Sequence, residues 1–519
     1  MLVLDLPLLA PAALFAGAAA CFSKPGRRPR AALLLAELSA LTALASAVVC
    51  AVMLAAAGAG VGSLVGLFGA GLEARVDAVS ITMLVLVTFI GWIVLRYAST
   101  YLDGEDRQGA FTGWLCLTLA AVLLLVTAGN LVQLVASWIA TSLFLNRLLI
   151  FYHARPGARR VARKKFVTAR LGDIALIIAA VLLGLAYRTS DIGQILDAAR
   201  NGEGGRLAVT AAGLLAASAL LKSAQFPTHG WLTEVMETPT PVSALLHAGV
   251  INAGGFLLIR FADVLLLAPG VLAVLVATGG FTALFGSMVM LTQPSVKTSL
   301  AWSTVAQMGF MIFECGLALF PLALLHIVAH SLYKAHAFLA SGGAVEAVTA
   351  IRRPGPVAIP GVGAVARAFL SALVIFASAG FAFGVPHKSP QAFALGAILI
   401  FGVAYMLAQG FSDTAPRALT RRTAAYALAT SIGYFALQAA AIHLTAGVLP
   451  PAPAPGALEW ALIILALLSF GLVAVLQAMF PLWAYHPAAT GLRVHLANGL
   501  YANAAFDRLI GSWSLRSAS

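Results

Sequence analysis

The segment 221–260 carries ionisable side chains within stretches that are otherwise apolar enough to lie in a membrane. These residues are Lys222, His229, Glu234, Glu237 and His247. A charge at bilayer depth costs roughly 2.5 to 3.5 kcal/mol on insertion scales, so a chain that keeps one there is expected to use it. Pro227 breaks the segment just after Lys222, and Pro239 and Pro241 introduce the next one. Broken helices beside an ionisable group are typical of transporters, where the break exposes backbone to an ion path.

A second ionisable group lies in one later apolar run. His326, His330 and Lys334 are spaced i, i+4 and i+8, which places them on one helical face. Two histidines four residues apart can bind zinc, but no third and fourth ligands or nearby general base accompany them. A hydrated relay for protons or ions fits this pattern better, with His326 and His330 bridging Lys222 and Lys334. The alternative is helix–helix hydrogen bonding without a transport role.

Acidic residues in the apolar runs allow more than one interpretation. Arg170 and Asp173 stand three residues apart at the start of a run. They either form an ion pair at a helix end, or Asp173 is the counterion of a membrane lysine. Glu37 and Glu314 have no sequence context that indicates a role.

A further set of charged or titratable residues flanks the apolar runs. Its members are His229, Glu234, Glu237 and Lys297. They either line a mouth of the ion path or contact a partner subunit.

Apolar runs of about 20 residues recur along the chain and predict about 14 or 15 membrane-spanning helices. These helices would position the ionisable residues. The chain has 519 residues, of which 61% are hydrophobic and 10% charged, and its mean hydropathy is +0.95. The runs are continuously apolar and rich in Ala and Leu, so they lack the alternation of a β-barrel. We therefore expect an all-α polytopic membrane protein. Residues 1–485 would form one transmembrane domain and residues 486–519 a short cytoplasmic tail.

The net charge of +13 reflects cations in alternate loops, not a nucleic-acid site. These cations lie in 24–30, in 155–170, at Arg352 and Arg353, in 417–422, and at Arg493, Arg508 and Arg516. With an odd number of spans they all fall on one side, so the positive-inside rule predicts an outside N-terminus and a cytoplasmic tail. The block 155–170 also has the charge to bind anionic lipid or an acidic partner surface.

Cofactor chemistry has no sequence support in this chain. The four cysteines, at 21, 50, 116 and 315, show no CxxC spacing, which favours buried free thiols over metal ligands or disulfides. No Gly-rich nucleotide loop and no flavin or quinone signature appears. We therefore expect no enzymatic step and no metal or cofactor here.

Five sequence motifs surround the ionisable residues: VTARLGD from Val167, KSAQFPTHGWL from Lys222, PTPVSALLHA from Pro239, KTSLAWSTVAQMG from Lys297 and HIVAHSLYKAHAFLASG from His326. Together they resemble the antiporter-like subunits of respiratory complex I and of multisubunit cation/proton antiporters. This motif core spans about residues 130–345. The resemblance implies that Lys222 is the proton-carrying lysine of a broken helix 7. His247, His326, His330 and Lys334 would form the polar axis of helices 8 and 11, with helix 11 also broken.

Within that superfamily, INAGGFLLIR from Ile251 and SLFLNRLLIFY from Ser142 look like the DabB branch of two-component inorganic carbon transporters. The branch implies a multi-pass protein of the bacterial inner membrane that conducts H+ or Na+. It also implies a DabA-like soluble partner on the cytoplasmic face, similar to β-carbonic anhydrases, which would hold the zinc and hydrate CO2 or trap bicarbonate. Alternatives are a proton channel of an NADH-quinone pump, a cation/proton antiporter component and a structural scaffold.

Two departures from the complex I pattern stand out. Complex I subunits have a glutamate after the tryptophan of helix 5, whereas this chain has Ile139 after Trp138. Either Asp173 or a partner residue would then have to modulate Lys222, or the pump cycle differs. The helix 12 lysine is also missing, because the span 362–384 has only Arg367.

Overall fold

The computed structural model describes residues 5–67, 70–235, 238–341, 361–384, 388–411, 416–483 and 486–510. Glu237, Arg352, Arg353 and Arg516 lie outside the described residues. Thirteen helices in the described part are long and apolar enough to cross a membrane. The helices Val296–Gly316 and Pro390–Gly410 have similar lengths and pack among them. The predicted all-α polytopic class is confirmed.

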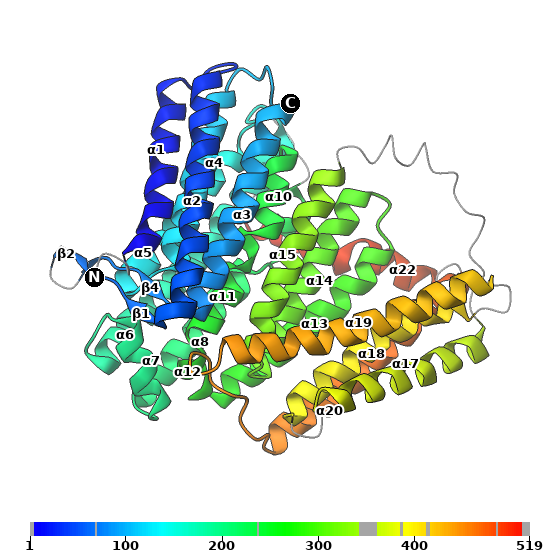
Figure 1. Cartoon of the computed structure of the whole chain (residues 1–519). Helices are drawn as coiled ribbons and strands as arrows, with labels where there is room; N and C mark the ends of the chain where they lie inside the picture. Colours follow the sequence, from blue (N-terminus) through cyan, green and yellow to red (C-terminus); the bar gives the residue numbers. More distant parts are fainter. Residues whose placement is uncertain are drawn as a thin grey trace.

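The chain forms an upright N-terminal bundle and a central group of broken and continuous helices (Figure 1). The first group comprises η1 (Leu6–Leu8), α1 (Leu9–Ser23), α2 (Arg30–Ala57), α3 (Ala78–Tyr101), α4 (Gln108–Val126), α5 (Leu131–Leu149), α6 (Pro156–Tyr187), α7 (Ile192–Arg200) and α8 (Gly205–Lys222). The central group comprises α9 (Gly230–Thr233), α10 (Thr240–Ala248), η3 (Val250–Asn252), α11 (Ala253–Arg260), α12 (Ala262–Leu266), α13 (Pro269–Leu291), α14 (Val296–Gly316) and α15 (Phe320–Ala340).

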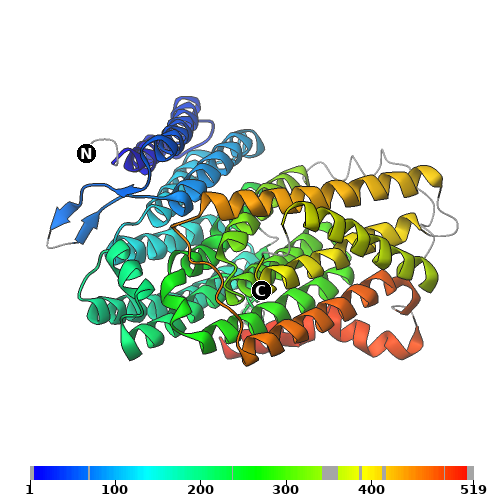
Figure 2. The ribbon, with the colours of Figure 1, turned by 60° about the horizontal axis from the view of Figure 1, so that its bottom comes forward.

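A third group of helices lies beside the central group and runs at an angle to α1, α2 and α3 (Figures 1 and 2). Its members are α17 (Val362–Ala382), α18 (Pro390–Gly410), α19 (Arg417–Leu444) and α20 (Ala457–Ala478). The chain then continues through α21 (Phe480–Trp483), η6 (Pro487–Ala489), α22 (Thr490–Ala497), η7 (Gly499–Tyr501) and α23 (Ala502–Leu509). The group has an apolar core of its own around Phe376 and Phe435, and α19 packs on α15.

Two short antiparallel strand pairs lie between α2 and α3. β1 (Gly60–Val61) pairs with β4 (Arg75–Val76), and β2 (Val65–Leu67) pairs with β3 (Ala70–Leu72). The register joins Gly60 to Val76 and Val65 to Leu72. These pairs form a hairpin outside the spans, next to the α4–α5 turn, where Ala74 bridges to Ala128.

Helix breaks occur where the sequence removes or redirects backbone hydrogen bonds. α8 ends at Lys222, Ala224 takes a left-handed φ of 49°, and Pro227 has no N–H with which to continue the helix. The next span is interrupted after α10 at Gly249, whose φ of −121° and ψ of −77° lie outside the helical region, and it resumes as α11. The prediction that helix 11, here α15, is broken is wrong. α15 is continuous because its interior has neither Gly nor Pro after Pro321 at its start.

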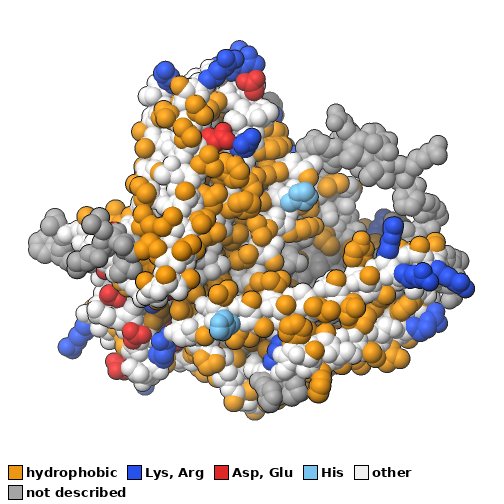
Figure 3. Space-filling model, in the orientation of Figure 1, with side chains coloured by type: hydrophobic (Ala, Val, Ile, Leu, Met, Phe, Trp, Pro, Cys, Tyr) orange, Lys and Arg blue, Asp and Glu red, His pale blue; other side chains and the backbone are white. Residues whose placement is uncertain are grey.

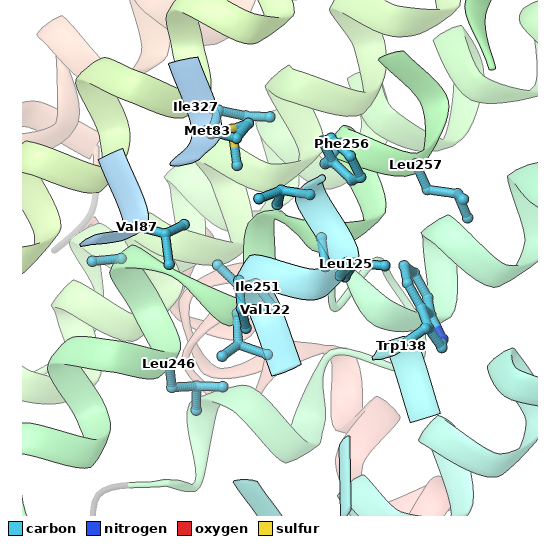
Figure 4. Packing of buried hydrophobic residues seen from close by; sticks show 14 of the residues in the cluster. Met83, Val87, Val122, Leu125, Trp138, Leu246, Ile251, Phe256, Leu257 and Ile327 are labelled. Carbon is cyan, nitrogen blue, oxygen red and sulfur yellow. The ribbon is translucent and has the colours of Figure 1, made fainter. Parts of the chain in front are cut away.

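The broken span lies at the centre of the bundle. In the most apolar 18-residue stretch of Thr240–Arg260, 94% of the residues are buried inside the protein. The corresponding share for Ala457–Ala478 is 17%. Figure 4 shows apolar side chains around this span, including Val122 and Leu125 of α4, Trp138 of α5 and Ile251 of the break. A peripheral helix such as α20 instead turns Leu465 and Leu468 outward, as expected for a surface that contacts lipid.

Contacts between loops define two ends of the bundle. At the first end, which we call the basic face, the α1–α2 turn 24–30, the α3–α4 turn 102–108, the segment 150–165 and the tail 490–509 meet. Arg28 pairs with Asp103 at 2.9 Å, and Lys164 pairs with Asp507 at 2.9 Å. Figure 3 shows Lys and Arg side chains gathered at the α1–α2 end and at the start of α19.

The other end, which we call the hairpin face, contains the strands, the segments 127–130 and 188–204, α12 and the loop 445–456. Arg200 pairs with Asp263 at 3.0 Å and donates to the carbonyl of Val448 at 3.3 Å. Gln391, at the start of α18, donates to the carbonyl of Pro453 at 2.7 Å. The start of α18 therefore lies at this face.

A buried ion cluster fixes the hairpin face to the broken span. Arg260, at the end of α11, pairs with Asp77 at 2.6 Å, and Arg75 pairs with the same carboxylate at 2.7 Å. Burial alone would raise the pKa of Asp77. The two guanidinium groups and the backbone N–H of Ser80 nevertheless hold that pKa well below its ordinary value. The carboxylate is therefore charged at neutral pH and caps α3, because Ser80 N donates to it at 2.8 Å.

The first prediction concerns which face is cytoplasmic. A cysteine replacing exposed Arg159, on the basic face, should react with an impermeant thiol reagent only in inverted vesicles. A cysteine replacing Ala454, on the hairpin face, should react only in right-side-out cells or vesicles. Reaction of both from the same side would contradict the two-face arrangement, and exchange of the two patterns would reverse the orientation.

Candidate functional site

Lys222 is the last residue of α8, and its ammonium group lies inside the bundle. The side chain is buried, and Nζ stands 4.3 Å from the ring centroid of Trp138 on α5. Nζ has no hydrogen-bond partner within the described ranges. The negative C-terminal end of the α8 dipole and the face of the indole ring both favour a cation here. Unlike the other buried cations of this region, Lys222 is not fixed by a hydrogen bond.

Asp173 supplies a negative charge near Lys222. It is buried on α6, which packs on α8 and is joined to it where Ser218 Oγ donates to Gly172 O at 2.8 Å. Asp173 interacts electrostatically with Lys222, and Arg170 Nη2 lies 2.6 Å from its Oδ2. The pair does not lie at a helix end as expected, because α6 begins at Pro156 and both residues lie in its interior. The other interpretation, Asp173 as the counterion of Lys222, stays a prediction.

Lys165 is a member of this site that sequence reasoning missed. Its side chain is buried, and Nζ donates to Ser142 O at 2.8 Å and to Ser142 Oγ at 3.1 Å. Lys165 and Lys222 line one small cavity of about 10 Å³, together with Thr168, Trp231 and Val250. A cavity of this size holds about one water molecule. The spacing in the sequence could have indicated Lys165, because it precedes Asp173 by two helical turns and would lie on the same helix face. It was instead counted with the basic residues of 155–170.

His247 occupies the second break. Its ring is fully buried, stacks on Phe338 at 4.2 Å between centroids, and places Nδ1 3.0 Å from Thr304 Oγ1. The break at Gly249 leaves the His247 carbonyl without its helical partner, and His330 Nε2 donates to that oxygen at 3.1 Å. Val250, three residues on, lines the cavity of Lys222. The break thus joins the Lys222 cavity to α15.

The three residues on α15 point to different partners. Lys334 Nζ donates to Ser303 Oγ at 2.8 Å and to Leu300 O at 3.1 Å, both on α14. At the other end of the row, His326 Nδ1 lies 3.0 Å from Glu314 Oε2. This pairing gives Glu314 a context that the sequence could not provide, since it joins residues of two separate helices.

The expected order of the relay, with His326 and His330 bridging Lys222 and Lys334, stays a prediction. The structure shows two further contacts on this route. The interrupted span of His247 contributes Val250 to the Lys222 cavity, and His330 donates to the His247 carbonyl. His326 contacts Glu314. Because α15 begins at the hairpin face, both histidines lie nearer that face than Lys334 does.

The predicted mouth residues have separate environments. Lys164 is fully buried, and its Nζ donates to both oxygens of Glu234 at 2.7 and 2.8 Å. The same Nζ lies 2.9 Å from Asp507 of α23. His229 is buried against Trp302, 4.8 Å between ring centroids, and Lys297 is the second residue of α14. Glu234 therefore anchors the tail through Lys164.

The described residues around Lys222 include no group of metal ligands, and α5 has no acidic residue. Within the described ranges, no group of three or more His, Cys, Asp and Glu residues is arranged to hold a metal ion. Ile139, which follows Trp138 on α5, packs against the apolar core. Asp173, Arg170 and Lys165 are ionisable groups that interact electrostatically with Lys222.

Comparison with known proteins places the chain in a family. A model described as NADH:quinone oxidoreductase/Mrp antiporter, TM, matches residues 128–356, and one for the complex I chain 5 N-terminus matches residues 63–112. A protein of Halothiobacillus neapolitanus named probable inorganic carbon transporter subunit DabB2 is 37% identical over 457 residues, 87% of this chain and 82% of that one. The chain belongs to the DabB family. This agrees with the resemblance found in the motifs.

Other relatives match over shorter or more distant alignments. The probable inorganic carbon transporter subunit DabB of Hydrogenovibrio crunogenus is 46% identical over 275 residues, which is 52% of this chain and 53% of that one. The alignment thus spans about half the length of that relative. The solved structure of an Mrp complex from a Dietzia species covers 98% of this chain and 59% of that chain, with a TM-score of 0.63 at 24% identity. That likeness shows the fold.

The second prediction concerns the Lys164 cluster. Lys164→Met removes the ammonium that neutralises Glu234 and Asp507, so we expect destabilisation by about 3–5 kcal/mol, as for other broken buried ion pairs. The measurement is thermal unfolding of the purified protein in detergent. Arg163→Met is the matched control, because its side chain is exposed on the same helix and should change stability by less than about 0.5 kcal/mol. Equal stability of both variants would mean that the cluster does not anchor the tail.

Proposed function

We propose that this chain is the proton-conducting membrane subunit of an energy-coupled inorganic carbon uptake complex. The observation that carries the proposal is Lys222, a buried ammonium at a helix break, near Asp173 and without a hydrogen-bond partner in the described part of the chain. A group held in this way can exchange its proton, whereas a structural lysine is normally fixed by acceptors. Membership of the DabB family supports the link to inorganic carbon.

The ionisable residues form a ladder through the core. From the basic side, Lys165 and Lys222 line one cavity together with Val250. Val250 follows the break at Gly249, and His247 precedes it. His247 is followed by His330, His326 and Glu314. Lys334, on α15, is held by its hydrogen bond to Ser303 of α14. Most of these groups are nitrogen bases, which exchange protons. Hard cations such as Na+ instead prefer several oxygen ligands. The coupling ion proposed is therefore H+.

The membrane potential provides enough energy for such coupling. At about 150 mV, one elementary charge that crosses the membrane releases roughly 3.5 kcal/mol. This corresponds to a concentration ratio of a few hundred for a neutral solute coupled one to one. One proton per carbon molecule is therefore sufficient to accumulate CO2 as a trapped product.

The carbon chemistry is assigned to a partner. Hydration of CO2 near neutral pH is typically done by a zinc-bound hydroxide, which needs a dedicated set of protein ligands. We propose that a soluble DabA-like zinc subunit supplies them and docks on the basic face, at the cytoplasmic side of a bacterial inner membrane. The exposed cations of 155–163 offer it a positive surface.

The third prediction tests this division of labour. Expression of this chain alone should not restore growth in air to a host that lacks carbonic anhydrase, and expression of the partner alone should also fail. Expression of both should restore growth, because trapping and driving force are then combined. The measurement is growth in air, together with immunodetection of both proteins in the membrane. Growth with this chain alone would contradict the proposal and assign the carbon path to this subunit.

A further inference from the structure

The ladder ends at a point that the proposed function leaves unexplained. Glu314 and His326 lie in the halves of α14 and α15 nearest the hairpin face; Glu314 is buried and His326 is partly buried. A proton that reaches them has not yet left the protein. The span 362–384 offers only Arg367, whose guanidinium group donates to Phe411 O. The outlet must therefore use other residues.

α19 carries a row of polar side chains from Glu314 outward. Tyr434 interacts electrostatically with Glu314. The Oη atom of Tyr434 is buried and has no hydrogen-bond partner in the described part of the chain. Gln438 follows one helical turn later and is fully buried, and its Nε2 is likewise without a described partner. α19 packs on α15, so this row adjoins the helix of His326.

Lys388 closes the row at the hairpin face. Its Nζ donates to Gln438 Oε1 and lies 4.6 Å from the ring centroid of Phe435. Lys388 immediately precedes Ser389, the N-cap of α18, and this end of α18 is tied to the 445–456 loop by Gln391. The ammonium therefore reaches from the face into the protein and binds a buried amide.

Buried polar atoms without protein partners are rare in native proteins and are normally satisfied by water. Three of them lie along this one path: His326 Nε2, Tyr434 Oη and Gln438 Nε2. A file of water that bridges these atoms would satisfy all three. It would also extend the ladder to the surface, since a water file conducts protons between fixed donors and acceptors.

We propose that Glu314, Tyr434, Gln438 and Lys388 line a hydrated outlet that connects His326 to the hairpin face. This proposal rests on the proton conduction put forward above. Lys388 would be a positioning and exchange group at the outlet and not a second Lys222, because it hydrogen-bonds Gln438.

The fourth prediction tests the outlet without using transport. In a chain whose four native cysteines are replaced by alanine, Gln438→Cys should react with a charged, impermeant methanethiosulfonate reagent added at the hairpin face. Leu437→Cys is the matched control. Leu437 is the neighbour of Gln438 in the sequence, but its side chain is 53% exposed on the apolar outer surface of α19. We expect modification of the residue 438 thiol to be at least tenfold faster. Equal rates, or no modification at 438, would overturn the outlet.

Flux measurements separate this inference from the proposed function. In liposomes under an imposed potential, Lys388→Met and Gln438→Leu should each reduce proton flux at least tenfold, while elution on size exclusion stays native. Arg421→Met, exposed on the same helix, should conduct normally. Normal flux through both outlet variants would refute the outlet and leave the proton-conducting function intact. Absence of flux through the native protein would refute the proposed function, and thiol modification would still decide whether the path is hydrated.

Discussion

The structure depends on keeping one ammonium group, that of Lys222, inside a membrane bundle without fixing it. Trp138 offers only the face of its ring, the end of α8 offers partial negative charge, and Asp173 offers a carboxylate that is shared with Arg170. These interactions make the charged form tolerable, but none of them is a hydrogen bond to Nζ. By contrast, the fully buried Lys164 has two carboxylate partners. The difference separates an exchangeable charge from a structural one.

The two helix breaks follow from the same requirement. A continuous α10–α11 helix would use the His247 carbonyl internally and would separate the Lys222 cavity from α15. The break at Gly249 frees that carbonyl for His330 and brings Val250 to the cavity. Buried ion clusters at the two faces hold the neighbouring segments in place, with Arg260 and Asp77 at the hairpin face and Lys164 at the basic face.

The sequence was sufficient to predict features that depend on local spacing. Apolar run length predicted the polytopic helical class, and the motifs around Lys222 predicted the family. Features that depend on contacts between distant segments could not be predicted. The Glu314–His326 pair joins two helices, and Lys165 enters the site only because α5, α6 and α8 meet there. The assumption of a broken helix 11 failed because it came from resemblance, whereas the local sequence of α15 contains no helix breaker.

The most direct test of the central claim is proton flux through the purified protein in liposomes under an imposed potential, with Lys222→Arg beside Lys222→Met and the native chain. The account predicts that both variants insert and fold normally but conduct at background rates. Methionine has no proton to exchange, and an arginine at this position stays protonated at any accessible pH. Native-like flux through Lys222→Arg would contradict the account, because Lys222 would then be a fixed charge and the ladder would not conduct through it.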